Sequence, residues 1–385
     1  MLALTIVGCN STSIESQNGP VCNADTVQPR PDVSQLVLDF DSIMRVRLDS
    51  SRCPGAAVVI VQDSKIVFLK TYGVKSTADQ SPLDAHTRFR IASMSKGFAG
   101  VVAAMLVAQG KLSLNERVID ILPDFQLSDS AQTARIRVWH LLSHCTGLPR
   151  HTYTGKVEYN EPRDSILAAL RTVPLEGKEG EIFAYQNFSF SLIEDIVKIR
   201  TGKSYAQLLK EYIFLPAGMA DAILTEDEWR TQPNKAIPHS TDRTGAYFPQ
   251  DLNDKYFNTP SAGGVVASIS DMAQWLKLLL GQMPAIAPKQ VLDTAFLPRV
   301  ETQSRAFAHR WENSLGSQYA LGWRIIDMCD HHIICHGGTV NHYRSEIALD
   351  RNAGIGICFL WNAHCQYQAT LGPEFFSLYE ELSTL

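Results

Sequence analysis

The sequence of 385 residues lacks three features that would each assign a class at once. It has no excess of positive charge, because 35 basic residues stand against 40 acidic ones for a net charge of −5. It has no C-x-x-C pair among its eight cysteines, and no apolar run of the roughly 18 residues that span a bilayer. These absences argue against a nucleic-acid-binding surface, a zinc ribbon or thioredoxin motif, and an integral membrane protein.

Motifs of several other classes are also missing. No G-x-S-x-G marks an α/β-hydrolase nucleophile, and no H-E-x-x-H marks a zinc protease. Gly202-Lys203-Ser204 is like the end of a phosphate-binding loop, but Val197 stands where that loop needs its first glycine. The adjacent His331 and His332 would point to opposite faces of a strand. The sequence therefore predicts no metal site.

The N-terminus combines a short apolar run with a cysteine. Residues 1–9 end in Ile-Val-Gly-Cys, which resembles the lipobox of a bacterial lipoprotein, although no Lys or Arg precedes Arg30. Residues 10–31 are rich in Asn, Ser, Thr, Gln and Pro, as in a flexible tether. Either the true start lies upstream, or the run is a short apolar tail with no targeting role. We favour the first and expect residues 1–30 to be a truncated signal and tether, with Cys9 lipidated and the protein exported to the periplasm on a membrane anchor. In that compartment Cys22 and Cys53 are a candidate disulfide.

Hydrophobic periodicity predicts strands at both ends of the chain and helices between them. We expect an α+β fold, in which an antiparallel sheet is flanked by helices and carries an inserted all-helical lobe. The sheet lobe would comprise residues 31–90 and about 246–385, and the helical lobe about 91–245. The expected strands are 56–60, 65–69, 319–327, 332–336, 344–349 and 354–361; the expected helices are 94–109, 135–144, 163–172, 188–200, 204–215, 270–280 with Ser270 as N-cap, and 374–382.

Ser93-Met94-Ser95-Lys96 matches the pattern S-x-x-K at the start of the helix expected over 94–109. Three residues turn about 300° around a helix, so Ser93 and Lys96 lie one turn apart on one face. The unpaired N–H groups of the first turn favour negative charge on the Ser93 hydroxyl, and a partly buried Lys96 can lose its proton and act as a base. The pattern is short enough to arise by chance, so it needs support from elsewhere in the chain.

Two Y-x-N sequences occur downstream. Tyr185-Gln186-Asn187 directly precedes a helical pattern, whereas Tyr256-Phe257-Asn258 lacks that context. A tyrosine near a protonated lysine has a lowered pKa and can shuttle protons, and the amide of Asn187 can orient the lysine and a substrate carbonyl. We therefore favour Tyr185 and Asn187 as site residues.

A glycine pair ends the expected strand over 332–336. In His336-Gly337-Gly338-Thr339, the glycines Gly337 and Gly338 leave the strand edge open to a substrate backbone. The N–H of Thr339, with that of Ser93, can form an oxyanion hole. In the expected hairpin Arg324 lies nearly opposite His336, where it is either a carboxylate-binding residue or an ordinary solvated arginine.

These three motifs, in this order, resemble those of the serine β-lactamase and penicillin-binding protein superfamily, on its class C, DD-peptidase and family VIII esterase side. The similar blocks run from about residue 50 to residue 362. Besides the motifs, they are Phe89-Arg90-Ile91-Ala92, residues 141–149, residues 201–205, Pro216-Ala217-Gly218-Met219, Ala262-Gly263-Gly264, Ser270-Asp271-Met272 and Leu321-Gly322-Trp323.

The resemblance implies a serine hydrolase that works without a cofactor. Ser93 would form an acyl-enzyme, Lys96 would be its general base, and Tyr185 would relay protons to the leaving group and later from the hydrolytic water. Asn187 would position the substrate amide. His336 stands where many relatives have lysine and would carry charge only when protonated. Gly97, inside the helix, would make its first turn less rigid.

The resemblance leaves three substrate classes open: a D-Ala-D-Ala peptide of a DD-carboxypeptidase, a short-acyl ester, and the β-lactam of a class C-like β-lactamase. The missing lysine at position 336 disfavours the β-lactamase. A non-catalytic binding protein on the same fold is the remaining alternative, but Ser93, Lys96 and Tyr185 are all present. We expect a small-molecule or peptidoglycan-derived substrate and no nucleic-acid partner.

Overall fold

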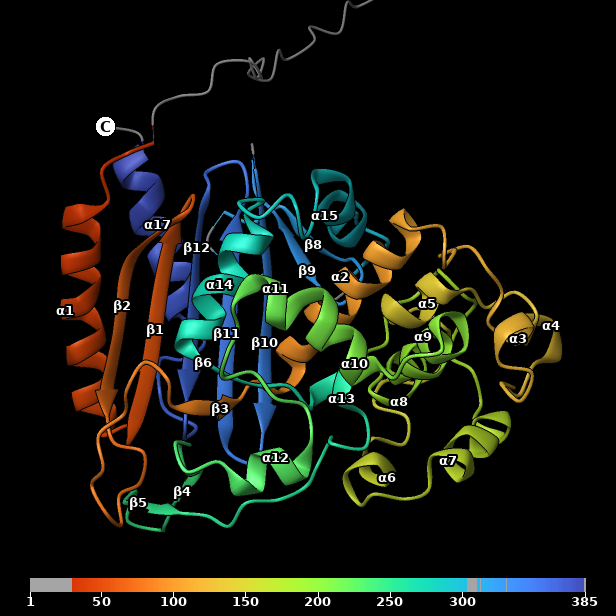
Figure 1. Cartoon of the computed structure of the whole chain (residues 1–385), viewed down its shortest axis with the longest axis horizontal. Coiled ribbons are helices and arrows are strands. Elements are labelled where there is room, and N and C mark those ends of the chain that lie inside the picture. Colours follow the sequence, from red (N-terminus) through yellow and green to blue (C-terminus); the bar gives the residue numbers. More distant parts are fainter. Residues whose placement is uncertain (1–29, 303–309, 312, 330, 384–385) are drawn as a thin grey trace, which may run out of the picture. The chain divides into compact units, whose positions relative to one another are not determined.

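An eight-stranded antiparallel sheet organises the computed structural model, which describes residues 30–302, 310–311, 313–329 and 331–383 (Figure 1). The order β2-β1-β12-β11-β10-β9-β8-β7 places the first two strands of the chain beside the last one. The predicted sheet built from both ends of the chain is therefore confirmed. Its strands are β1 (Gly55–Gln62), β2 (Lys65–Gly73), β7 (Val300–Glu301), β8 (Gly316–Tyr319), β9 (Arg324–Asp327), β10 (His332–Val340), β11 (Tyr343–Asp350) and β12 (Ile355–Trp361).

The central strands are buried on both faces. In β1, Val59 and Val61 pack into one hydrophobic cluster, whereas Val58 and Ile60 pack into a second cluster on the other side of the sheet. A strand covered on both faces reads as a continuous apolar run rather than as an alternation. This explains why residues 56–61 are all hydrophobic.

Helices cover both faces of the sheet. The terminal helices α1 and α17 pack on the outer face, and the other helices lie on the opposite side or extend away from it (Figure 1). The helices are α1 (Ser34–Ser51), α2 (Ser95–Ala108), α3 (Val118–Ile121), α4 (Ser130–Thr133), α5 (Val138–Leu142), α6 (Thr154–Glu158), α7 (Arg163–Ala169), α8 (Phe188–Ser191), α9 (Ile193–Thr201), α10 (Tyr205–Leu209), α11 (Leu215–Ala217), α12 (Glu226–Thr231), α13 (Pro260–Gly263), α14 (Ile269–Leu279), α15 (Lys289–Phe296) and α17 (Leu371–Ser383).

Shorter elements link these layers. The 3-10 turn η1 (Ala92–Met94) leads into α2, η2 (Leu170–Thr172) continues α7, and the π-helical turn η3 (Lys210–Phe214) joins α10 to α11. Two ribbons pair outside the main sheet: β3 (Arg88–Arg90) with β6 (Val266–Ser268), and β4 (His239–Thr241) with β5 (Tyr247–Pro249). Residues 31–385 group into one unit, so the division into two lobes near residues 91 and 245 stays a prediction.

Two local predictions are wrong. The strand expected over 319–327 is two strands, because the chain turns between β8 and β9 at Gly322, whose φ is +78°. The cap of α14 is Ser268 rather than Ser270. The Ser268 hydroxyl accepts from the N–H of Asp271 (3.1 Å), and the Asp271 carboxylate accepts from the N–H of Ser268 (3.0 Å). This reciprocal pair satisfies two N–H groups at the start of the helix.

The expected Cys22–Cys53 disulfide is also replaced. Cys53 pairs with Cys365, with Cα atoms 5.8 Å apart, and joins the segment before β1 to the segment after β12. Cys9 and Cys22 lie outside the described residues. Within the described residues, none of the helices has both the length and the apolar character needed to cross a membrane. The same residues contain no group of His, Cys, Asp or Glu side chains suited to a metal ion.

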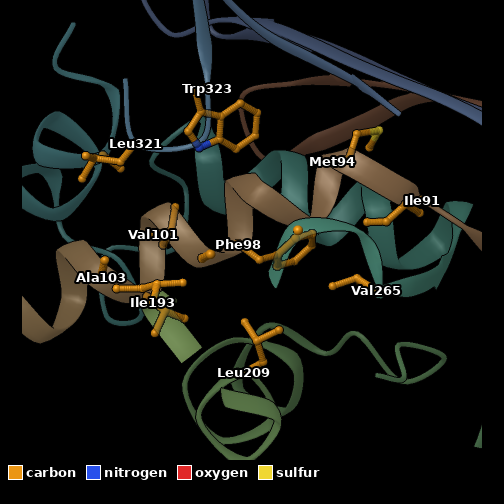
Figure 2. Close-up of a cluster of buried hydrophobic side chains, with 14 of the residues drawn as sticks. Ile91, Met94, Phe98, Val101, Ala103, Ile193, Leu209, Val265, Leu321 and Trp323 are labelled. Carbon is orange, nitrogen blue, oxygen red and sulfur yellow. The ribbon is translucent and has the colours of Figure 1, made fainter. Parts of the chain in front are cut away.

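The core on the inner face of the sheet forms around α2. Figure 2 shows Phe98 and Val101 of this helix among residues from distant parts of the chain, including Trp323 and Leu321. Phe98 also stacks on Trp275, with ring centroids 3.9 Å apart. α2 is thus fixed by aromatic packing directly after Ser93.

Gly97 allows the Trp323 ring to lie against α2. A Cβ atom on Gly97 would overlap the Trp323 ring, and one on Gly100 would overlap the carbonyl oxygen of Leu321. The expectation that Gly97 loosens the first turn is therefore replaced by a packing role. The glycine lets a buried indole approach the backbone of the helix.

We predict that Gly97→Ala destabilises the protein by about 1–3 kcal/mol, because the added methyl group overpacks the Trp323 contact. Gly155→Ala is the matched control: this helical glycine has open space around its Cβ position, and the exchange should be neutral or slightly stabilising. Urea denaturation of both variants measures the difference. Equal stability of the two variants would show that the Trp323 contact imposes no constraint.

Candidate active site

Ser93 lies in the turn η1, where backbone strain and a strand contact fix its position. The preceding Ala92 has φ +51°, in the left-handed region that residues other than glycine rarely adopt. The Ser345 hydroxyl on β11 donates to the carbonyl of Ile91 (2.7 Å) and ties the turn to the sheet. Ser93 is half-buried, so its hydroxyl is accessible from the cavity beside it.

Lys96 is completely buried below Ser93. Its Nζ lies 3.4 Å from Ser93 Oγ, 2.8 Å from Asn187 Oδ1 and 2.7 Å from the carbonyl oxygen of Ala262. Among the described residues no carboxylate forms an ion pair with this amine. The S-x-x-K spacing thus brings serine and lysine together, as the helical geometry predicts.

The environment of Lys96 favours an uncharged amine. Burial lowers its pKa well below the ordinary value, and the nearby charge of Arg324 lowers it further. A neutral amine has two N–H groups and one lone pair. Asn187 and the Ala262 carbonyl are acceptors for the two N–H groups, so the lone pair is left for the proton of the Ser93 hydroxyl.

Tyr185 forms a side-chain hydrogen bond with Ser93. Burial raises the pKa of Tyr185 to about 12, and its hydrogen bond with Ser93 only partly offsets this. The expected lowering of this pKa is therefore wrong, because desolvation of the phenolate outweighs the neighbouring charges. Tyr185 is a hydroxyl at neutral pH and can donate a proton.

His144, from the helix-capping segment after α5, holds Tyr185 in place. Its carbonyl accepts from the N–H of Ala184 (2.8 Å), and its Nδ1 accepts from the N–H of Gln186 (3.2 Å). Its ring centroid lies 4.3 Å from that of Tyr185. Residue 144 thus fixes the backbone on both sides of the tyrosine.

Asn187 is oriented by a second tyrosine. Its Nδ2 donates to the hydroxyl of Tyr256 (3.1 Å), which in turn donates to Glu158 Oε1 (2.9 Å). Because the Tyr256 proton is directed to a carboxylate, its oxygen is the acceptor for Asn187, and the Asn187 carbonyl is left to face Lys96. The second Y-x-N sequence therefore supplies Tyr256 to the same site, while its Asn258 bonds the carbonyl of Val157.

His336 lies in the interior of β10 and not at a strand end, because β10 continues to Val340. Its Nδ1 donates to the carbonyl of Gly337 (2.8 Å), and its Nε2 accepts from the Tyr319 hydroxyl (2.9 Å). Burial lowers the pKa of His336 well below its ordinary value, and Arg324 and Lys96 act in the same direction. His336 is therefore a neutral residue at physiological pH.

The edge of β10 opens beside Ser93. The ladder between β9 and β10 ends at the pair Arg324–Cys335, so Arg324 lies one position away from the predicted pairing with His336. Beyond this pair the N–H of Thr339 remains on the open side near η1. Gly338 lies against η1 so closely that a Cβ atom would overlap the carbonyl oxygen of Ile91. These positions suit the predicted oxyanion hole of Ser93 and Thr339.

A cavity of about 420 Å³ contains these groups. The site residues predicted from sequence that line it are Ser93, Tyr185, Asn187, Arg324, His336, Gly337, Gly338 and Thr339, with Lys96 directly beneath. The lining residues that the sequence did not indicate include Arg150, Glu158, Arg310 and Arg344. Of these, only Arg344 had a usable signal, because the two-residue turn Asn341-His342 places it opposite Thr339.

We predict that Lys96→Met lowers the rate of ester hydrolysis by about 10²–10⁴-fold, the usual contribution of a general base. It should also raise the melting temperature at pH 7. Unfolded Lys96 is protonated below its ordinary pKa of 10.5, whereas burial lowers this pKa in the folded chain, so folding favours release of the proton and burial of the amine costs stability at neutral pH.

Lys111→Met, at an exposed lysine just after α2, is the control and should leave both quantities unchanged. Calorimetry at pH 7 and an assay with p-nitrophenyl butyrate measure the two effects. A Lys96→Met protein that melts at a lower temperature and keeps its activity would contradict this description of the site.

Known proteins share both the sequence pattern and the fold. A sequence model of the β-lactamase family matches residues 40–366. The chain is 25% identical over 330 residues to Protein flp of Staphylococcus aureus (strain MW2), covering 85% of this chain and 63% of that protein. It is 26% identical over 330 residues to unguisins hydrolase ungD' of Aspergillus campestris (strain IBT 28561), covering 83% and 60%. It thus spans less than two thirds of the length of these relatives.

A solved structure supports the fold. The octameric penicillin-binding protein homologue from Pyrococcus abyssi superposes with a TM-score of 0.76 at 23% identity, covering 90% of this chain and 77% of that chain. The predicted α+β fold is thereby confirmed. Because the family match extends over most of the chain and includes the segments of Ser93, Tyr185 and His336, the protein belongs to the β-lactamase family, within the serine β-lactamase and penicillin-binding protein superfamily.

Proposed function

We propose that the protein is an acyl-serine hydrolase in which Ser93 attacks an amide or ester carbonyl. The observation that carries this proposal is the placement of Lys96 Nζ within hydrogen-bond distance of Asn187 Oδ1, the Ala262 carbonyl oxygen and Ser93 Oγ, so that a neutral amine would have two acceptors for its N–H groups and a lone pair for the Ser93 proton. A buried amine of lowered pKa is a base that needs no carboxylate partner. All other parts of the site are arranged around this pair.

The proposed reaction has two halves. Ser93 Oγ bonds to the carbonyl carbon while its proton moves to Lys96, and the N–H groups of Ser93 and Thr339 stabilise the oxyanion. Tyr185, a hydroxyl at neutral pH, then protonates the leaving nitrogen or oxygen as the acyl bond breaks, and it recovers its proton from Lys96. In the second half a water loses a proton to the same pair and its oxygen bonds to the acyl carbon; the bond from that carbon to Ser93 Oγ then breaks, Ser93 takes the proton back, and the acid is released.

The proposed substrate is an acyl compound with a terminal carboxylate, such as a peptide ending in D-Ala-D-Ala. Arg324 supports this choice, because it lines the cavity beside Tyr185 and its charge acts on the pKa of Lys96, Tyr185 and His336. The neutral His336 cannot supply the positive charge that a lysine would. A short-acyl ester is the second candidate, and a class C-like β-lactamase is the third.

Export is part of the proposal. The Cys53–Cys365 disulfide is typical of an oxidising compartment. The interpretation of Cys9 as a lipid-bearing residue agrees with the same compartment, the periplasm. Incubation with labelled palmitate and cleavage to a Cys9 N-terminus would test that part separately from the chemistry.

We predict that a fluorophosphonate or a fluorescent penicillin forms an adduct on Ser93, seen as a mass increase of the intact protein. Ser93→Ala should form none. Lys111→Met, at an exposed lysine outside the cavity, should still be labelled. Absence of an adduct on the unmodified protein, or an equal adduct on Ser93→Ala, would refute the hydrolase.

The same protein should then be assayed with a D-Ala-D-Ala peptide, p-nitrophenyl butyrate and nitrocefin. The peptide should be hydrolysed, and Arg324→Gln should reduce its kcat/KM by at least about tenfold, since a charge-assisted hydrogen bond to the carboxylate is lost. The ester has no carboxylate and should lose much less. Fast nitrocefin turnover with no peptide hydrolysis would favour the β-lactamase instead.

A further inference from the structure

One face of the β10 ribbon carries a row of charged side chains. Cys335 of β10 belongs to the hydrophobic cluster on the face opposite η1, and alternation places Gly337 and Thr339 on that same face. Residues directly opposite one another in a ladder share a face. The partners on this face are Arg324 opposite Cys335, Glu346 opposite Gly337 and Arg344 opposite Thr339.

This charged face and Ser93 belong to the same cavity. The cavity is lined by Ser93, Gly338 and His336 on one side and by Arg344 and Glu346 on the other, while the Arg324 guanidinium lies over the rings of Phe183 and Tyr319, beside Tyr185. The two sides connect around the edge of β10, because the ladder with β9 ends at Cys335. A substrate extended along this edge would direct alternate substituents to the two faces.

The charges along this row are unevenly matched. Glu346 is satisfied by Arg310, whose Nη2 lies 2.9 Å from both carboxylate oxygens. Arg344 has a different situation: its Nη1 donates to the hydroxyl of Thr339, and it forms no ion pair with a carboxylate among the described residues. Burial lowers the pKa of Arg344, and the charge of Glu346, which Arg310 already pairs, offsets this only in part.

Gly337 leaves space between the two arginines. It lies midway between the ladder positions of Arg324 and Arg344, and a Cβ atom at this position would touch only the carbonyl oxygen of Ser345, at 3.6 Å. The guanidinium fork of arginine matches the geometry of planar anions such as carboxylates. Gly337 therefore leaves open space at the ladder position between Arg324 and Arg344.

We propose that Arg344, with Thr339, binds a second anionic group on the leaving part of the substrate, so that the released residue carries two negative charges. This inference rests on the proposed function, which assigns Arg324 to the terminal carboxylate. The substrate would thus end in an acylated amino acid whose side chain carries a carboxylate or a phosphate. Its terminal carboxylate would lie at Arg324 and its side-chain anion at Arg344.

Binding to the Ser93→Ala protein tests the inference without any turnover. The probes are N-acetyl-D-Ala-D-Glu and N-acetyl-D-Ala-D-Gln, which have the same size and differ by one charge. By calorimetry at pH 7, the D-Glu peptide should bind at least about tenfold more tightly. A third probe with O-phospho-D-serine in the last position distinguishes a phosphate from a carboxylate as the preferred anion, and tighter binding of either anion supports the inference.

Three variants locate the effect. Arg344→Gln should remove the preference for D-Glu over D-Gln, and Arg344→Lys should retain part of it. Arg351→Gln, in the turn after the same strand and paired with Asp293, is the control and should retain the full preference. Equal binding of the two peptides, no binding of either, or a preference that persists in Arg344→Gln would overturn the inference.

Failure of the anion site and failure of the proposed function give different results. If the unmodified protein fails to hydrolyse a D-Ala-D-Ala peptide but the charge preference depends on Arg344, the anion site stands and the proposed substrate fails. If the peptide is hydrolysed but no preference is found, the opposite holds.

Discussion

The amine of Lys96 is the group on which the rest of the site depends. A lysine without exposure to solvent is stable in this fold only as a neutral amine, and its two N–H groups then need acceptors. Asn187 and the Ala262 carbonyl supply them from two different segments, α8 and α13. Asn187 can fill this role because two hydrogen bonds, from Asn187 to the Tyr256 hydroxyl and from Tyr256 to Glu158, fix the orientation of its amide. A base is thus prepared by hydrogen bonds that lie outside the reaction itself.

The sheet provides the other half of the site. β10 lies inside the sheet, between β11 and β9, but β9 pairs with only about the first half of β10. The released edge lies beside η1, which α2 and the Trp323 contact hold against the sheet (Figure 2). The nucleophile Ser93 and the open edge of β10 therefore lie side by side at the start of α2. A substrate would be bound between these two rigid elements.

Much of this arrangement was readable from the sequence. The S-x-x-K spacing has a fixed geometry on a helix. The strand patterns at both ends of the chain, with helices between them, predict a sheet built from both ends. The features that could not be predicted depend on which residues are buried against one another in the folded protein. The raised pKa of Tyr185 and the neutral state of His336 follow from desolvation by residues far away in the chain, such as Tyr319. The partner of Cys53 is 312 positions away, and nothing local indicates it. Arg344 is the intermediate case, since the turn at Asn341 fixes its register but not its lack of a carboxylate partner.

The protonation state of Lys96 is the central claim, and it can be measured directly. Lysine labelled with ¹³C at Cε gives one NMR signal per side chain, and the Lys96→Met variant assigns the signal of residue 96. If the description is right, that signal has the shift of an uncharged amine at pH 7 and moves only when the pH falls below neutrality. A signal that has the shift of an ammonium group at pH 7 and titrates near 10 would contradict it.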